Sequence, residues 1–469
     1  MTIPTYLENT PFDELTLGRK ASLTRTLRKE DIELFATMSG DVNPAHLDEA
    51  YAKNDFFHGI VGHGMWLGAL ISTALGTLLP GIGTIYLGQD IAFKKPVRIG
   101  DTIVVSVSVR SKATDKPIVT MDCSCINQKG EVVAEGTATV IAPTEKMRLP
   151  RPDAADVEIQ NHDRYHAIML SCRGLKSVIT AIIHPVKAEA IEAAADAARE
   201  NLIIPILVGP RARIQAAADE AKIDISKWEL IDTVHSHAAA AKGAELAANG
   251  TVEALMKGSL HTEEFLGAIV PSAVGLRTER RLSHVYLMDV PGYAKPLIIT
   301  DAVVNIAPDL ATKADICRNA IDFWRTIFQE KRLPKLAILA AVETVNDKMQ
   351  ATVDAAALCK MAERGQIVNG ILDGPLAFDN AISQQAAAEK GIVSPVAGDA
   401  DILVVPEIES GNILAKQLTF LGHADAAGIV LGARVPIILT SRADNLRCRL
   451  LSCAMAVLLA AARREGRLK

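Results

Sequence analysis

The stretch FATMSGDVNPAHLDEAY, residues 35–51, places an acid, a proline turn and a histidine close together. Pro44 fixes its own φ and disfavours helical geometry at the preceding Asn43, so the chain should turn here. Asp41 and His46 then lie on the two limbs of one turn, where their side chains can reach one water molecule. An acid and a neutral imidazole that share a water form a general acid/base unit. Alone, each residue is more often structural, but the whole arrangement favours chemistry.

A glycine that follows a histidine marks the second feature of this region. In GIVGHGMWLGALISTALG, Gly64 begins a charge-free apolar segment, which predicts a buried helix over about residues 65–79. The free N–H of Gly64 would lie at the positive end of the helix dipole and could stabilise an oxygen that becomes negative during a reaction. We expect the neighbouring His63 to orient the loop.

Near the other end of the chain, the segment GARVPIILTSRADNL runs from an apolar strand directly into polar residues. Polar groups at the carboxyl end of a strand are where open α/β sheets bind ligands. The guanidinium of Arg442 can grip a phosphate with two hydrogen bonds, and Ser441 can add a neutral donor. Asp444 follows as a possible base. This cluster predicts an anion site.

Three further residues are weaker candidates for binding at a cleft. Lys257 lies in a Lys-Gly-Ser turn, Asp301 follows the predicted strand LIIT, and Asn412 lies in ESGN at the start of a predicted helix. For each of them alone, a structural role is the stronger interpretation.

Other anion-binding signals are sparse. The segment GLRTERRLSH carries Arg277, Arg280 and Arg281, which could contact phosphate or form a solvated charged face, and the sequence favours neither. No P-loop GxxxxGK[ST] and no strand-bound GxGxxG is found. Nucleoside triphosphate and dinucleotide binding therefore lose their strongest sequence support.

The elements that must position the first site are a helix and a sheet. Between residues 103 and 141, Val105, Val107 and Val109 alternate with polar residues, which is typical of a half-buried antiparallel strand. A turn is expected at residues 128–130. The first 142 residues are thus predicted to form a helix wrapped by a meandering sheet.

The rest of the chain has another pattern. Residues 142–166 are polar and contain prolines, whereas Ala-rich amphipathic segments beyond them alternate with short apolar runs such as LIIPILVG. This alternation predicts parallel βαβ units, in two lobes with a cleft between them. We therefore predict a domain over residues 1–150, a linker over 151–160 and an α/β domain over 161–469.

Composition excludes several classes of function. The 469 residues are 49% hydrophobic and carry a formal net charge of −5 without long basic runs, so we expect no nucleic acid or membrane partner. Seven scattered cysteines indicate reduced thiols, and the N-terminus shows no signal peptide. These features predict a cytoplasmic protein.

The first motifs resemble a known family. SGDVNPAHLD, HGM and LPGIGTIYLGQDIAFKKPVRIGDTIVVSVSV are similar to the R-specific enoyl-CoA hydratases of the MaoC-like family, over about residues 10–142. The resemblance implies an α+β hotdog fold in which Asp41 and His46 hold a water. That water would add across the double bond of 2-enoyl-CoA to give (R)-3-hydroxyacyl-CoA. Gly64 is implied as the donor to the thioester oxygen.

The remainder resembles phosphate acetyl- and butyryltransferases over about residues 160–469, most distinctively in ESGNILAKQL and LTSR. The resemblance implies a two-lobed α/β fold that exchanges acyl groups between coenzyme A and phosphate at Ser441 and Arg442. It implies no acyl-enzyme, metal or redox cofactor. Acetyl-type members place a catalytic aspartate several residues beyond the arginine, where Cys448 stands here. Asp444 is closer to the arginine, as in butyryl-type members, so the base stays open and the pattern slightly favours butyryl or another non-acetyl acyl group.

Together these features predict a bifunctional enzyme. Its substrates would be enoyl-CoA and acyl-CoA together with inorganic phosphate or acyl phosphate, without a cofactor, and we expect a homo-oligomer built from dimers. In the alternative, one module is catalytic and the other binds acyl-CoA or drives assembly. The intact Asp41, His46 and Asn-Pro turn argue against a degenerate first module.

Overall fold

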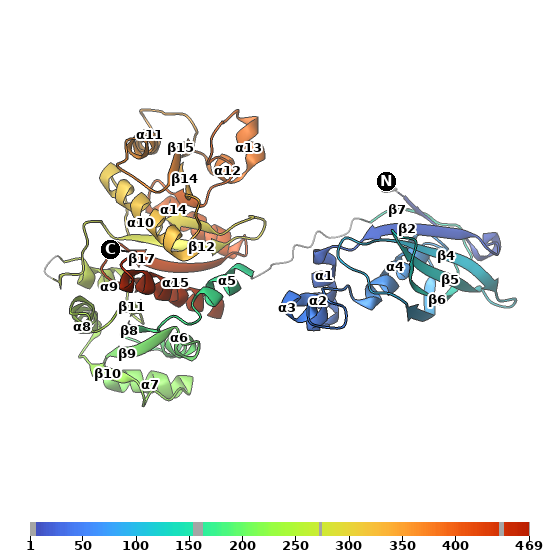
Figure 1. Cartoon of the computed structure of the whole chain (residues 1–469), viewed down its shortest axis with the longest axis horizontal. Helices are drawn as coiled ribbons and strands as arrows, with labels where there is room; N and C mark the ends of the chain where they lie inside the picture. The colour runs from blue at the N-terminus through green and yellow to red at the C-terminus, as the bar shows by residue number, and fades with distance from the viewer. Residues whose placement is uncertain (1–5, 153–162, 272–273, 440–444, 469) are drawn as a thin grey trace. The chain divides into compact units, whose positions relative to one another are not determined.

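The computed structural model describes residues 6–152, 163–271, 274–439 and 445–468, which are drawn in colour in Figure 1. The chain divides into two compact units, Met1–Ile159 and Gln160–Lys469. The first contains one helix-and-sheet core and the second a much larger sheet covered by helices.

The first unit packs helix α4 (Gly64–Thr77) against an antiparallel five-stranded sheet of order β2-β4-β5-β6-β3. A short separate pair joins β1 to β7. The strands are β1 (Tyr6–Glu8), β2 (Lys20–Thr26), β3 (Ile85–Phe93), β4 (Thr102–Lys112), β5 (Ile118–Asn127), β6 (Val132–Ile141) and β7 (Arg148–Pro150). The remaining helices are a 3₁₀ turn (Phe12–Glu14), α1 (Lys29–Ser39), α2 (Pro44–Leu47) and α3 (Glu49–Ala52).

The predicted helix and strands of this unit are confirmed in position. Val105 and Val107 on β4 are fully buried in one core with Ile71 of α4. Ser106 is also buried, which the alternation did not predict, and its hydroxyl hydrogen-bonds to that of Ser22 on β2 at 2.8 Å. The core therefore lies between α4 and the sheet, and both ends of α4 remain available to position a site.

The second unit is built on one 11-stranded sheet of order β10-β9-β8-β11-β18-β17-β12-β13-β16-β14-β15. Its strands are β8 (Val178–Ile183), β9 (Ile203–Gly209), β10 (Glu229–Asp232), β11 (Ala254–Lys257), β12 (Ser283–Asp289), β13 (Leu297–Thr300), β14 (Lys335–Leu339), β15 (Ile371–Leu376), β16 (Ile402–Val404), β17 (Asp425–Leu431) and β18 (Ile437–Ile438).

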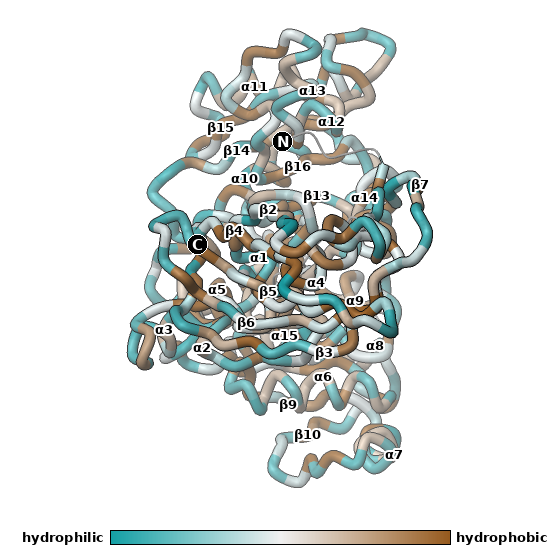
Figure 2. The backbone as a smooth tube through the Cα atoms, turned by 90° about the vertical axis from the view of Figure 1, so that its right-hand side faces the viewer, coloured by the Kyte–Doolittle hydropathy of each residue, from teal (hydrophilic) through white to brown (hydrophobic). Residues whose placement is uncertain are grey.

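Helices cover both faces of this sheet (Figure 1). They are α5 (Asp163–Ser171), α6 (Ala188–Arg199), α7 (Arg211–Ala221), α8 (Ser236–Ala248), α9 (Thr262–Ile269), α10 (Leu310–Phe328), α11 (Gln350–Glu363), α12 (Phe378–Ile382), α13 (Gln384–Glu389), α14 (Ile408–Phe420) and α15 (Leu446–Arg464). Helices such as α7 carry both hydrophobic and hydrophilic turns (Figure 2), as expected where one face covers a sheet. No helix among the described residues is both long and apolar enough to cross a membrane.

The direction of the strands differs from the predicted all-parallel arrangement. Strand β17 is antiparallel to both β18 and β12, and β12 is antiparallel to β13. The strands from β10 to β18 therefore run opposite to those from β13 to β15. As a consequence, the carboxyl ends of the two halves lie at opposite edges of one continuous sheet.

Candidate functional site

The turn that holds the acid and the histidine is built by local capping. The side chain of Asn43 accepts a hydrogen bond from the N–H of Ala45 at 3.1 Å, and Pro44 occupies the first position of α2. A side-chain cap followed by proline is a favoured helix start. The turn predicted at Asn43-Pro44 is present, and it places His46 on the one-turn helix α2.

The imidazole of His46 has a defined orientation. Its Nδ1 lies 2.7 Å from the carbonyl oxygen of Val61. Because a carbonyl oxygen only accepts, Nδ1 carries the proton in the neutral ring, and Nε2 is left with its lone pair. His46 is therefore held in the tautomer that can accept a proton from water.

A second histidine, His63, contacts both Asp41 and His46. His63 is only 4% exposed, and its Nε2 donates to the backbone carbonyl of Asp41 at 3.0 Å. Its ring lies 3.9 Å from that of His46, measured between centroids. Burial lowers the pKa of His63 by more than its hydrogen bond to the Asp41 carbonyl raises it, so the ring is neutral at pH 7. His63 thus ties the chain at Asp41 to the ring of His46.

The acid and the two imidazoles converge. One oxygen of Asp41 and one ring nitrogen each of His46 and His63 all lie within 4.8 Å of one another. Asp41 is exposed, whereas His46 is half-buried. Groups at this spacing can hold a water between acid and base, and the same set could also ligate a metal ion.

The amide of Gly64 lies beside this cluster, at the first position of α4 with His63 as its N-cap. Its N–H forms no hydrogen bond among residues 6–152, as expected for the first turn of a helix. A Cβ at this position would lie 3.2 Å from the ring of Phe93. Glycine therefore leaves room at this helix end, where the N–H can meet a ligand.

The predicted residues of the second site, Ser441, Arg442 and Asp444, lie outside the described residues. The described residues that precede them are placed by strand register. Met256 of β11 pairs with Ile438 of β18, and Ile438 pairs with Ile429 of β17 in the antiparallel sense. The chain after β18 therefore leaves the sheet at the edge where β11 ends and β17 begins.

At that edge the side chain of Asp425, the first residue of β17, binds residues at the start of α15. Its carboxylate accepts from the Asn445 amide at 2.9 Å and from Arg447 Nε at 3.0 Å. The thiol of Cys448 lies 3.8 Å from the same carboxylate. Asn445 also caps α15 by accepting from the Cys448 N–H at 2.9 Å. The Asp425 carboxylate thus lies beside Cys448, which stands at the position where an acetyl-type enzyme would have its aspartate.

Lys257 lies at this edge too, as the last residue of β11. It borders a small hollow of about 60 Å³ together with Ser259 and Arg449. The Nε of Arg449 is buried and has no hydrogen-bond partner among the described residues, while its Nη2 lies 3.7 Å from Asp196. The hollow therefore offers cationic donors from β11 and α15.

Asp301 and Asn412 lie together, but away from Lys257. The Asn412 amide donates to the carbonyl of Ala302 at 3.2 Å. The Asp301 carboxylate is buried and accepts from the N–H groups of the next loop, including those of Val303 and Val304 at 3.0 Å. Both residues follow strands whose ends lie at the opposite edge of the sheet from Asp425. Asp301 therefore shapes the loop after β13, and Asn412 holds helix α14 to that loop.

Comparison with known proteins adds the family. The model described as "Phosphate acetyl/butaryl transferase" matches residues 233–457. "Phosphate acetyltransferase" of Rhizobium meliloti is 56% identical over 303 residues, which cover 65% of this chain and 95% of the relative. The chain belongs to the phosphate acetyl/butyryltransferase family. A branched-chain phosphotransacylase from Enterococcus faecalis V583 is 32% identical over 60% of this chain and 98% of its own, with a TM-score of 0.52.

The first unit matches a different model. "MaoC like domain" covers residues 14–126. The R-hydratase PhaJ1 from Pseudomonas aeruginosa is 42% identical over 33% of this chain and 99% of its own, with a TM-score of 0.32. This member of the phosphate acetyl/butyryltransferase family thus carries a MaoC-like hotdog domain, which confirms the predicted combination. The chain is an enzyme of both kinds, lyase and transferase.

Two contacts were not predicted from the sequence of this acyltransferase family member. The bond from His63 to the carbonyl of Asp41 joins residues 22 positions apart, and that from Cys448 to Asp425 joins residues 23 apart. The HADAAG segment that contains Asp425 precedes an apolar run, which was a usable signal for a polar residue at a strand start.

Proposed function

We propose that the first unit hydrates 2-enoyl-CoA to (R)-3-hydroxyacyl-CoA at Asp41 and His46. The convergence of these side chains, with His46 Nδ1 held 2.7 Å from the Val61 carbonyl, is the observation that carries the proposal. The pair holds a water and takes one of its protons, while the oxygen forms a bond to C3. A proton returns from the pair to C2, so the elements of water are added in full.

The thioester oxygen gains negative charge as the C3–O bond forms, and the N–H of Gly64 is the proposed donor to it. Its place at the start of the 14-residue helix α4 adds the favourable helix dipole. The proposal needs no metal ion, although Asp41, His46 and His63 could ligate one.

For the second unit, we propose that CoA and phosphate exchange an acyl group at the edge formed by β11, β18 and β17. Ser441 and Arg442 stay the proposed phosphate-binding residues, because the chain leads from β18 to this edge. The 56% identity to a phosphate acetyltransferase supports acetyl as the acyl group. No cofactor is needed, because thiol and phosphate are both nucleophiles.

The base that the sequence left open is assigned in this proposal to Asp425 rather than Asp444. Its carboxylate lies beside Cys448, where acetyl-type members have an aspartate. The thiol proton of CoA passes to this carboxylate, the sulfur attacks the acyl carbon, and the bond to the phosphate oxygen breaks. In the reverse direction phosphate attacks the thioester, and the thiolate leaves with that proton.

Two properties complete the proposal. Strand β3 is an edge of its sheet and exposes Ile85 and Leu87, which supports a dimer through this edge. All seven cysteines are free, which supports a reducing compartment such as the cytoplasm.

The deciding experiment measures both reactions on one preparation of the full chain. Hydration of crotonyl-CoA is followed by loss of the enoyl thioester absorbance, and acyl transfer by phosphate-dependent release of CoA from acetyl-CoA. Both activities are expected. Absence of hydration on short and medium enoyl-CoAs would make the first unit a binding or assembly module instead.

A further inference from the structure

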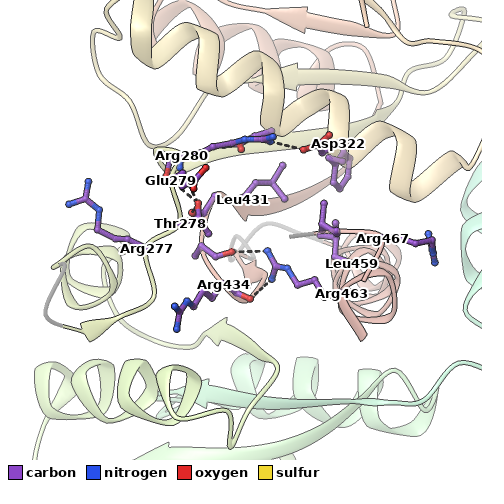
Figure 3. Close-up of a pocket in the computed structure, with 15 residues that line it drawn as sticks. Arg277, Thr278, Glu279, Arg280, Asp322, Leu431, Arg434, Leu459, Arg463 and Arg467 are labelled. Atoms are coloured by element: carbon purple, nitrogen blue, oxygen red, sulfur yellow. Dashed lines mark hydrogen bonds and ion pairs between the residues drawn. The ribbon is translucent and has the colours of Figure 1, made fainter. Parts of the chain in front are cut away.

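The second unit contains a cavity of about 680 Å³ that neither proposed reaction uses (Figure 3). It lies between α10, α15, the segment before β12 and the turn after β17. Leu431, which lines it, is at the opposite end of β17 from Asp425. At about 3.3 Å per residue, seven residues separate this cavity from the proposed transfer edge by roughly 20 Å.

Arginines dominate the lining. The lining includes two acids, Glu279 and Asp322. It includes five arginines, which are Arg277, Arg280, Arg434, Arg463 and Arg467. Figure 3 shows Arg463 reaching from α15 to the turn after β17, with Arg280 and Asp322 joined on the side of α10. The lining therefore has an excess of three positive charges if all of these groups are ionised.

Two of these arginines already have carboxylate partners. Arg280 pairs with Asp322 at 2.6 Å, and Arg467 pairs with Glu465 at 2.5 Å. Arg277, Arg434 and Arg463 form no ion pair with any residue that the structure describes. With Glu279 as the one remaining acid of the lining, an excess of two positive charges is left on these three arginines.

Arg463 shows that the charge is partly desolvated. Its Nη1 and Nη2 donate to the carbonyls of Arg434 and Ala433 at 2.6 and 2.7 Å. Its Nε is buried and has no partner in the described part of the chain. Burial lowers the pKa of Arg463 to about 10, so the group is still cationic at pH 7. A buried cation without an anion is costly, and a bound anion would relieve that cost.

Apolar side chains form the rest of the wall. Leu431 at the end of β17 and the half-buried Leu468 contribute apolar surface to it, whereas Phe323 and Leu459 are buried behind the lining. Sites for small organic ligands combine such apolar walls with a few polar groups and have volumes of about 300–1,000 Å³. A simple solvated charged face would lack this hollow with its apolar part.

We propose that this cavity binds a small organic polyphosphate, with Arg277, Arg434 and Arg463 on its phosphates and the apolar wall against its organic part. Guanidinium groups suit phosphate oxygens because they offer paired donors in one plane. The site goes beyond the two proposed reactions, and its ligand is a bound effector rather than a substrate.

The test measures binding to the full chain by calorimetry, with ATP and inorganic tripolyphosphate as probes. These two probes share a triphosphate, and only ATP carries a nucleoside. We expect ATP to bind at least tenfold more tightly than tripolyphosphate. Equal affinities would contradict the role of the apolar wall, and no binding of either probe would overturn the site.

Two double variants locate the binding. Arg277→Ala/Arg434→Ala removes two exposed cavity arginines and should weaken ATP binding at least tenfold, with unchanged KM values for CoA and phosphate. Arg199→Ala/Arg364→Ala makes the same charge change at exposed positions outside the cavity and should bind within twofold of wild type. Equal weakening in both variants would mean non-specific attraction and overturn the proposal. A raised KM for CoA in the first variant would mean that these arginines act at the transfer site, and it would also overturn the proposal.

Discussion

The thiol of Cys448 lies 3.8 Å from a carboxylate oxygen of Asp425, although the two residues are 23 positions apart in the sequence. The contact arises because β17 begins at the edge to which the antiparallel β18 leads. Asp425 also holds Asn445 and Arg447, so it organises the start of α15 as well as being the proposed base.

Asp425→Asn should lower acyl transfer about 10²-fold, because an amide cannot take the thiol proton. Cys448→Asp in the same chain places a carboxylate next to the lost one and should recover at least tenfold of that activity. Transfer is measured as CoA release from acetyl-CoA, with crotonyl-CoA hydration as an internal reference that stays constant.

The matched control for that experiment is Asp289→Asn. Asp289 pairs with Asp425 across β12 and β17 and is ion-paired with Arg164, so the substitution makes the same charge change at the same edge. It should leave transfer within about threefold of wild type, well short of the loss expected for a base. If the Asp425→Asn/Cys448→Asp chain stays as slow as Asp425→Asn, the aspartate is structural and not the base.

Asp41→Asn and His46→Ala should each lower hydration by about 10²–10⁴-fold, because each removes one half of the acid/base unit. Acyl transfer should be unchanged, since the second unit contains its own core. Asn54→Ala, an exposed nearby change with only a local side-chain bond, serves as the control. Retention of full hydration by either variant would remove that residue from the proposed chemistry.

Gly64→Ala should lower hydration about tenfold, because the added Cβ would lie 3.2 Å from the Phe93 ring and shift the helix end that carries the N–H. Phe93 is 48% exposed, so Gly64→Ala/Phe93→Ala has room for the methyl group and should recover activity. Crotonyl-CoA hydration measures both. A single variant as active as wild type would mean that this amide position tolerates displacement and is not the oxyanion donor.

Local and distant features differ in how far the sequence predicts them. Asn43-Pro44 dictates its own turn, so the convergence of Asp41 and His46 followed from neighbouring residues. Lys257 ends one short apolar strand and Asp301 follows another, yet they lie at opposite edges of the sheet. A buried strand has the same composition in either direction, so only the pairing of β12 and β17 reveals which ends meet.

The His46 tautomer and the Asp425 contact were unpredictable for a related reason. Val61 comes close to His46 only after the first unit has packed. Asp425 comes close to Cys448 only after the strands of the second unit have paired. No local sequence pattern encodes either distance. The cavity arginines also include both residues that are close in sequence and one that is distant. Arg277 and Arg280 were visible as a charged run, whereas Arg463 follows them by more than half of the length of the second unit.

His284 predicts a pH dependence of stability for the second unit. It is buried on β12, and burial lowers its pKa from the usual 6.5 to about 3. Between these values the unfolded chain binds a proton that the folded chain does not, so stability rises with pH in this window and is lost as pH falls below about 6.5. The slope from this group is at most about 1.4 kcal/mol per pH unit.

His284→Leu cannot titrate, so its free energy of unfolding should fall less between pH 6.5 and pH 5 than that of the wild type. Urea unfolding followed by tryptophan fluorescence measures the difference. Both proteins carry Trp66→Phe, so that the signal comes from Trp228 and Trp324 of the second unit alone. His184, which is also buried with a lowered pKa, contributes equally to both proteins. Identical slopes would show that His284 takes up its proton without unfolding, and that its burial does not control acid stability.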